Sequence, residues 1–135
     1  MTYGVADASY QAAGGQTGIQ QLVADFYRIM DKDVAFQALR QMHRKELTES
    51  QDKLATFLCG WLGGPRTYRQ KYGPISIPQV HQHLKITPVQ KSLWLACMQK
   101  AITRQGYQQD FADYLMAQLA VPAERIVAAG ATRRK

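Results

Sequence analysis

Two of the chain's three histidines, His81 and His83, stand just before a stretch that contains Trp94, in the segment HQHLKITPVQKSLWLACM at residues 81–98. An imidazole can bind a metal ion or haem iron, and it can transfer protons near neutral pH. From their residue types alone, the two histidines could provide one metal ligand, form part of a zinc site, or lie on the surface.

A zinc site is not favoured by the rest of the sequence. Zinc requires three or four protein ligands, and beyond His81 and His83 the chain offers only His43 and remote cysteines or carboxylates. The two Gly-Gly pairs lack the context of a phosphate-binding loop, and no nucleophile motif is present. What remains is a histidine in a loop that enters an apolar, tryptophan-bearing helix, which suits an axial ligand of haem iron.

Composition narrows the class of protein. The 135 residues predict one domain, 46% of them are apolar, and no apolar run is long enough for a membrane span. The N-terminus does not resemble a secretory signal, and Cys59 and Cys97 lie within apolar patterns, so we expect two free thiols in a cytoplasmic protein. The net charge of +7 favours acidic partners, yet no segment interleaves aromatic and basic residues as single-strand nucleic-acid binders do.

The elements that position these residues are predicted to be helices. Apolar residues recur with helical spacing in four main segments, which predicts four helices that each bury one face. The expected buried residues of the first two are Ile19, Leu22, Val23, Phe26, Tyr27 and Met30, and Leu54, Phe57, Leu58, Trp61 and Leu62. Those of the last two are Trp94, Cys97, Met98, Ala101 and Ile102, and Phe111, Tyr114, Leu115 and Leu119. Because Pro74 and Pro78 bracket the single alternating segment, no strand is expected. The predicted fold class is all-α.

Local signals predict the helix ends. The first main helix covers about residues 16–31, and Asp33 caps a short helix that continues to about Arg40. A capping box at 48–51 begins the next helix, which Gly63-Gly64-Pro65 ends. Thr87-Pro88 begins a helix that Gly106 ends, and Pro122 is expected to kink or restart the last one. The irregular segment 65–86 is long for a compact domain, which is typical of a functional or disordered loop.

Three features occur in an order that resembles the group II truncated haemoglobins. They are a Gly-Gly pair before a helix with Phe26-Tyr27, a second pair in FLCGWLGGPRTY, and a histidine thirteen residues before the tryptophan of WLACM. The resemblance covers about residues 9–120. It implies a two-over-two helical sandwich around haem b, with one globin domain over 1–135, a folded core at about 9–128 and a basic tail at 129–135.

The resemblance also implies a role for several residues. The spacing to Trp94 assigns the iron ligand to His81, with Ile86 as the apolar residue five positions later, and it leaves His83 near a haem propionate. The implied haem-binding set is His81, Tyr68, Phe57, Leu54, Trp94, Met98 and Ile86. The implied ligand-binding set on the distal side is Tyr27, Trp94, His43, Ser50 and Leu54, in which Tyr27, Trp94 and His43 offer hydrogen-bond donors and Ser50 leaves an open path.

One position departs from the family pattern. Relatives commonly carry an arginine directly before the proximal histidine, and it pairs with a propionate, whereas this chain has Val80. Tyr68, Arg69, Lys71 or His83 are the candidates to replace that contact, and Tyr68 keeps the family's position.

These features imply a haem protein that binds dioxygen, carbon monoxide and nitric oxide, and that releases dioxygen slowly. A redox role, in nitric oxide dioxygenation or peroxidase-like turnover, requires a reductase that the sequence does not identify. Two other classes stay open from the sequence. One is a cofactor-free basic helical module that binds nucleic acid or protein, and the other is a metal-binding or thiol-redox protein.

Overall fold

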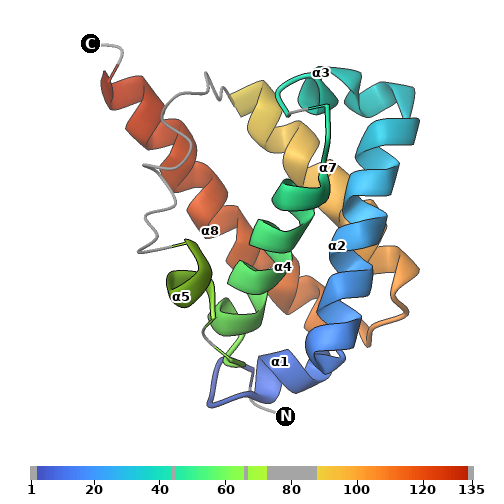
Figure 1. Cartoon of the computed structure of the whole chain (residues 1–135), viewed down its shortest axis with the longest axis vertical. Helices are drawn as coiled ribbons and strands as arrows, with labels where there is room; N and C mark the ends of the chain where they lie inside the picture. Colours follow the sequence, from blue (N-terminus) through green and yellow to red (C-terminus); the bar gives the residue numbers. More distant parts are fainter. Residues whose placement is uncertain (1–2, 44, 66, 73–87, 134–135) are drawn as a thin grey trace.

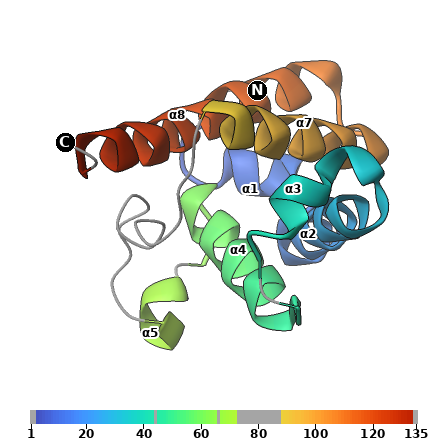
Figure 2. The ribbon, with the colours of Figure 1, turned by 90° about the horizontal axis from the view of Figure 1, so that it is seen from above.

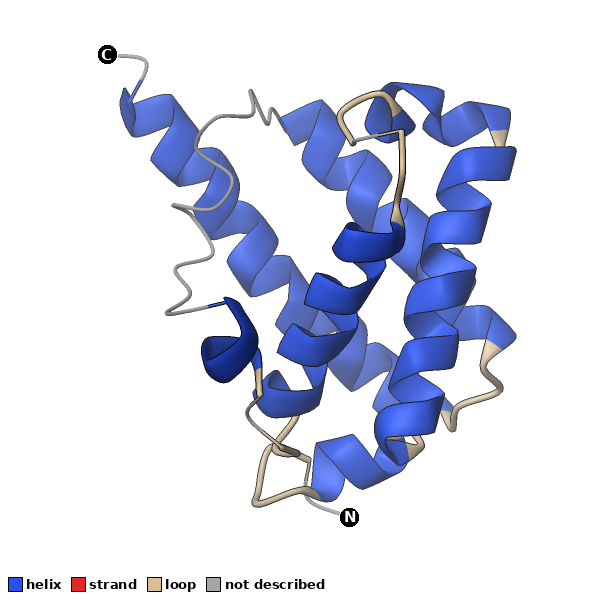
Figure 3. Cartoon of the chain, viewed as in Figure 1, coloured by secondary structure: helices blue, strands red, loops and turns tan. Residues whose placement is uncertain are grey.

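The computed structural model describes residues 3–43, 45–65, 67–72 and 88–133, and every regular element in those ranges is helical (Figure 3). In chain order the elements are α1 (Ala8–Ala12), α2 (Gly15–Lys32), the 3-10 turn η1 (Val34–Phe36), α3 (Gln37–Arg40), α4 (Thr48–Trp61), α5 (Tyr68–Tyr72), α7 (Pro88–Arg104) and α8 (Gln109–Arg133). The all-α prediction is therefore confirmed. None of the helices in the described ranges is long and apolar enough to cross a membrane.

The four long helices form two layers (Figures 1 and 2). Seen from above, α7 and α8 lie together in one layer, and α2 and α4 lie in the other. Contacts join α2 to α4 and α7 to α8, and α2 also packs extensively on α7 across the two layers. This is the two-over-two arrangement that the family resemblance implies.

The core lies where the apolar stripes of these helices meet. The largest fully buried side chains come from all four long helices and include Ile19, Leu22, Phe26, Met30, Leu58, Met98, Ile102, Phe111 and Leu115. Each such side chain contributes roughly 1.5–3 kcal/mol by leaving water. The buried stripe predicted for α2 is confirmed, but on α4 only Leu58, Cys59 and Leu62 are buried, and Leu54, Phe57 and Trp61 stay partly exposed.

Glycines with left-handed backbone stand at the predicted helix ends. Gly14 (φ +92°) precedes α2, Gly63 (φ +98°) follows α4, and Gly106 (φ +71°) follows α7. At Gly63 a Cβ atom would also lie 2.1 Å from the carbonyl oxygen of Ala6. Glycine is required there because a side chain would collide with the segment that leads into α1.

Two predicted helix signals need correction, and one is confirmed. Asp33 Oδ1 accepts a hydrogen bond from the Ala35 amide at 3.0 Å, so it caps the short helical segment as expected. The capping box at α4 is wrong, because Thr48 is already helical and bonds instead to the Glu46 carboxylate outside the helix. α8 continues through Pro122, so the helix does not restart there, and the alternative of a kink stays a prediction.

Candidate functional site

Three of the predicted site residues come together around Phe26, which lies in the middle of α2. The ring of Phe26 meets the edges of Tyr27 and Trp94, with ring centroids 5.0 and 5.3 Å apart. The ring of His43, from the turn after α3, meets Tyr27 with centroids 5.8 Å apart and nearly perpendicular planes. We call these four residues the Tyr27 cluster, and it joins α2 to α7 across the two layers.

Tyr27 offers a hydroxyl that the described part of the chain does not use. Its side chain is only 6% exposed, yet the hydroxyl makes no hydrogen bond to any described residue. Every fully enclosed side-chain nitrogen or oxygen in the described ranges has a partner, so this hydroxyl must reach open space. Burial raises the pKa of Tyr27 well above its ordinary value. The group therefore stays protonated near neutral pH and can donate a hydrogen bond to a ligand.

His43 has its imidazole oriented by the short helix before it. Nδ1 lies 3.0 Å from the carbonyl oxygen of Leu39. Because a carbonyl oxygen can only accept, Nδ1 carries a proton, and in the neutral imidazole Nε2 then has a lone pair. This restricts the donor role that the sequence predicted for His43 to its protonated form. When neutral, its Nε2 can accept a hydrogen bond or bind a metal.

A second aromatic group lies where α4 meets α5, and it contains two further predicted site residues. Phe57 stacks on Trp61 with centroids 6.0 Å apart, and the ring of Tyr68 meets Phe57 at 6.4 Å and Tyr72 at 5.2 Å. We call these four residues the Phe57 cluster. It places Tyr68 beside the partly exposed apolar face of α4.

Lys71, a candidate for the missing propionate contact, is already paired in this structure. Its Nζ lies 2.6 Å from Asp52 Oδ2, and the Tyr72 hydroxyl donates to the same carboxylate oxygen. These two donors lower the pKa of Asp52, and the bond to Asp52 raises the pKa of Tyr72 to about 12. Among the candidates, Tyr68 therefore remains better placed than Lys71.

The remaining predicted residues are distributed between the two layers. Leu54 is a partly buried residue packed against the core, Ser50 lies one turn before it near the start of α4, and Met98 is fully buried one turn after Trp94. His81, His83, Val80 and Ile86 lie outside the described residues, so their assignments stay predictions. In the described ranges no group of three histidine, cysteine or acidic residues could hold a metal ion.

The two cysteines are free and buried, as the sequence predicted. Cys97 is fully buried, and its thiol donates a hydrogen bond to the carbonyl oxygen of Phe26 at 3.4 Å. Burial raises the pKa of Cys97 to about 12 and also raises that of Cys59. These thiols are therefore packing residues, and Cys97 fastens α7 to α2 at the Tyr27 cluster.

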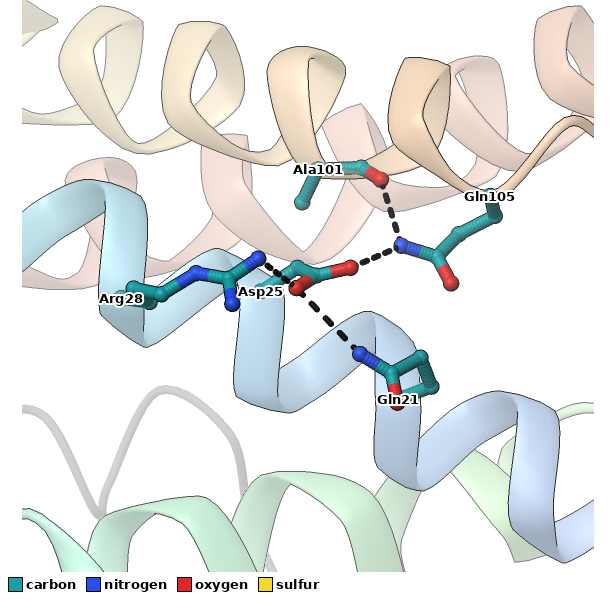
Figure 4. Close-up of polar contacts among 5 residues, drawn as sticks. All are labelled: Gln21, Asp25, Arg28, Ala101 and Gln105. Atoms are coloured by element: carbon teal, nitrogen blue, oxygen red, sulfur yellow. Dashed lines mark hydrogen bonds and ion pairs between the residues drawn. The ribbon is translucent and has the colours of Figure 1, made fainter.

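Asp25 was missed in the sequence, although a signal for it exists. It stands at helical spacing between Leu22 and Ile29, within the buried face of α2, and it is only 5% exposed. Its carboxylate accepts hydrogen bonds from side chains of α2 and from Gln105, which directly follows α7 (Figure 4). A charged residue at a buried position of an amphipathic helix was the pattern that could have identified it.

Comparison with known proteins gives one family. Residues 8–127 match the bacterial-like globins. The group 2 truncated hemoglobin YjbI of Bacillus subtilis (strain 168) is 29% identical over 121 residues, which are 90% of this chain and 89% of that protein.

Solved structures share the same fold. The group II 2-on-2 hemoglobin from the plant pathogen Agrobacterium tumefaciens has a TM-score of 0.83 and 27% identity, over 87% of this chain and 92% of that one. A truncated oxygen-avid haemoglobin from Bacillus subtilis has a TM-score of 0.81 and 29% identity, over 89% of this chain and 98% of that one.

Proposed function

The chain belongs to the bacterial-like globin family, and from this premise we propose that it is a haem b protein that binds dioxygen and other diatomic ligands and releases dioxygen slowly. When bound, haem supplies an iron atom that holds a small ligand on one face while a protein imidazole binds the other. The observation that supports the proposal most directly is the Tyr27 hydroxyl, which is nearly buried, protonated and without a hydrogen-bond partner in the described ranges.

Partly buried apolar side chains on α4 and α7 support a site for a flat apolar ring system. They include Leu54, Phe57 and Trp94. Such surface is costly to leave in water, at roughly 25 cal/mol per Å². We propose that haem covers part of it, with Leu54, Phe57, Trp94, Met98 and Ile86 against the ring, Tyr68 near a propionate and His81 as the iron ligand.

On the ligand side, this chain's residues supply hydrogen bonds and exclude water. Tyr27 and Trp94 approach from different helices and can both donate, while neutral His43 accepts or orients the Tyr27 hydroxyl. Ser50 and Leu54 line the approach from α4. A hydrogen bond to a charged acceptor contributes roughly 1.5–3 kcal/mol, or about one to two decades in release rate. The description of the Bacillus subtilis structure as oxygen-avid supports the same reading.

Slow release suits sensing, scavenging or redox conversion of nitric oxide or peroxide better than bulk transport of dioxygen. Carbon monoxide and nitric oxide are the other ligands we expect. A redox role requires a reductase that returns the iron to its ferrous state. The two free thiols support work in a reducing compartment, which we propose is the cytoplasm.

Titration of the purified apoprotein with ferric haem tests the proposal. We expect saturation near one equivalent with a Soret band, followed by a ferrous spectrum that shifts on addition of carbon monoxide. Serum albumin, which binds haem without this site, is the control for nonspecific association. A titration without saturation, or a spectrum equal to that of haem in detergent, would contradict the proposal.

A further inference from the structure

Asp25 forms a part-buried polar contact between α2, which carries Tyr27, and the residue directly after α7, the helix that carries Trp94 (Figure 4). Its Oδ2 accepts a hydrogen bond from Gln105 Nε2 at 2.7 Å, and its Oδ1 accepts from Gln21 Nε2 at 3.3 Å and pairs with Arg28. The Gln105 amide also donates to the carbonyl oxygen of Ala101 at 2.9 Å. One carboxylate therefore connects the middle of α2 to Gln105, the residue directly after α7, and Gln105 in turn bonds to the last turn of α7.

Asp25 does not face the same side of α2 as Tyr27. Residues two positions apart are about 200° apart around a helix, so the carboxylate and the Tyr27 hydroxyl point in nearly opposite directions. The Asp25 carboxylate also accepts hydrogen bonds from the side chains of Gln21, Arg28 and Gln105, and Gln105 directly follows α7. Any effect on a ligand beside Tyr27 must therefore pass through the position of α2.

Two adjacent residues of α2 hold α7 at different points along its length. Phe26 meets Trp94 at 5.3 Å and accepts the Cys97 thiol hydrogen bond at 3.4 Å. Asp25 holds Gln105, which lies about three helical turns beyond Trp94. Because Asp25 and Phe26 are about 100° apart around α2, these contacts together fix the rotation of α2 about its own axis. That rotation sets where the next side chain, Tyr27, points.

We propose that Asp25 is a positioning residue for the ligand site. By accepting the Gln105 hydrogen bond, its buried carboxylate fixes α2 against α7 and so fixes the Tyr27 hydroxyl relative to the Trp94 indole. This inference rests on the proposed function, since the property it controls is the hydrogen bonding of a ligand beside Tyr27.

An exchange of the two partners tests this role. Asp25→Asn leaves an amide oxygen that can accept from Gln105, but it removes the charge that strengthens this bond and pairs with Arg28. Gln105→Glu places a second carboxylate beside Asp25, so each single variant weakens the contact. The double variant Asp25→Asn/Gln105→Glu restores one carboxylate and one amide with the same side-chain lengths. We expect each single variant to release dioxygen about threefold faster or more, with a shifted C–O stretching frequency in the carbon monoxide complex, and the double variant to return toward the wild type.

Controls separate positioning from general stability. Lys100→Gln breaks an exposed hydrogen bond between α7 and Asp33, in which Nζ lies 3.0 Å from Oδ2, and it should leave release and stretching frequency unchanged. Gln105→Met removes the hydrogen bond from residue 105 to Asp25 and keeps Gln21 and Arg28 as partners of Asp25. This variant replaces Asp25→Asn in the comparison if Asp25→Asn does not fold. In a Tyr27→Phe background, Asp25→Asn should add no further acceleration.

Wild-type release and stretching frequency in Gln105→Met or Asp25→Asn, with only a lower urea midpoint, would overturn the proposal and leave Asp25 a structural residue. An equal acceleration with and without Tyr27 would overturn it too. If the wild-type chain itself fails to bind haem, the proposed function fails, and that result is visible before any variant is compared.

Discussion

His43 Nδ1 lies 3.0 Å from the carbonyl oxygen of Leu39, one helical turn before it. This contact determines which ring nitrogen carries the proton in the neutral imidazole, and it turns the ring edge-on to Tyr27. We therefore expect His43 to affect a ligand through the position of the Tyr27 ring.

His43→Phe should change dioxygen release by about threefold to tenfold, because the ring that meets Tyr27 edge-on loses both of its nitrogens. Phenylalanine keeps an aromatic ring beside Tyr27, so haem should remain bound. The ferric spin state should also change if Nε2 coordinates the iron in the absence of a ligand. Stopped-flow release and a ferric spectrum that both match the wild type would remove His43 from the site.

The helices could be predicted because their signals are local. Apolar spacing in α2 and α7 and glycines 14, 63 and 106 identified elements and their ends directly. The start of α4 could not be predicted in the same way, because the choice between Thr48 as a cap and Glu46 as an outside partner depends on how the preceding turn folds. Which side chains of α4 stay partly exposed also depends on packing that the sequence does not reveal.

The same distinction between local signals and tertiary packing applies to the residues of the candidate site. Tyr27, Trp94 and His43 could be named from the resemblance to the group II truncated haemoglobins, and the structure brings their rings together. The Asp25 contact could not, because Gln105 lies 80 positions away and no periodicity marks it. The orientation of His43 also depends on a tertiary position for the turn after α3, so the sequence predicted a donor where the neutral imidazole has an acceptor.

The proximal bond is tested by comparing two neighbouring histidines. His81→Ala should lose most of its haem to apomyoglobin, because the family resemblance and the spacing to Trp94 predict His81 as the iron ligand, whereas His83→Ala should retain it. The decay of the Soret band during transfer measures both. If His83→Ala loses haem and His81→Ala does not, the assignment is wrong.

Cys59 and Cys97 should not react with a thiol-specific disulfide reagent in the folded protein at pH 8. With its pKa raised to about 12, Cys97 is ionised to only about one part in ten thousand at that pH, and both side chains are buried. Two equivalents should react at once in urea, which is the control. A Cys59–Cys97 linkage in unreduced native protein would contradict the free-thiol assignment.

Stability should fall above about pH 10, where tyrosines in the unfolded chain ionise. Burial raises the pKa of Tyr27, and burial raises that of Tyr107 to about 12. The unfolded state then binds fewer protons than the folded state, so their contribution is complete below pH 10 and is lost as pH rises toward the folded pKa values. Urea midpoints should decline less steeply for Tyr27→Phe than for the wild type, and an identical slope would refute the role of Tyr27 burial.

The two proposed ligand donors are tested by substitutions that keep the aromatic packing. Tyr27→Phe retains the ring that meets Phe26 and His43, and Trp94→Phe retains a ring against Phe26. Tyr27→Phe removes only the O–H donor, and Trp94→Phe removes the N–H donor together with part of the indole. Each should release dioxygen about tenfold faster or more, as expected for one lost charge-assisted bond. Stopped-flow replacement of dioxygen by carbon monoxide measures the rate.

The matched control for both variants is Trp61→Phe, in the Phe57 cluster. Trp61 stacks on Phe57 at 6.0 Å and is the last residue of α4, whereas the His43 turn precedes the start of that helix. The Trp61→Phe variant loses an indole N–H just as Trp94→Phe does, but its rate of dioxygen release should stay within about twofold of the wild type. If Trp61→Phe accelerates release as much as Trp94→Phe, loss of any large aromatic side chain explains the effect, and Trp94 is no ligand donor. If Tyr27→Phe alone leaves the rate unchanged, its partnerless hydroxyl serves something other than the ligand.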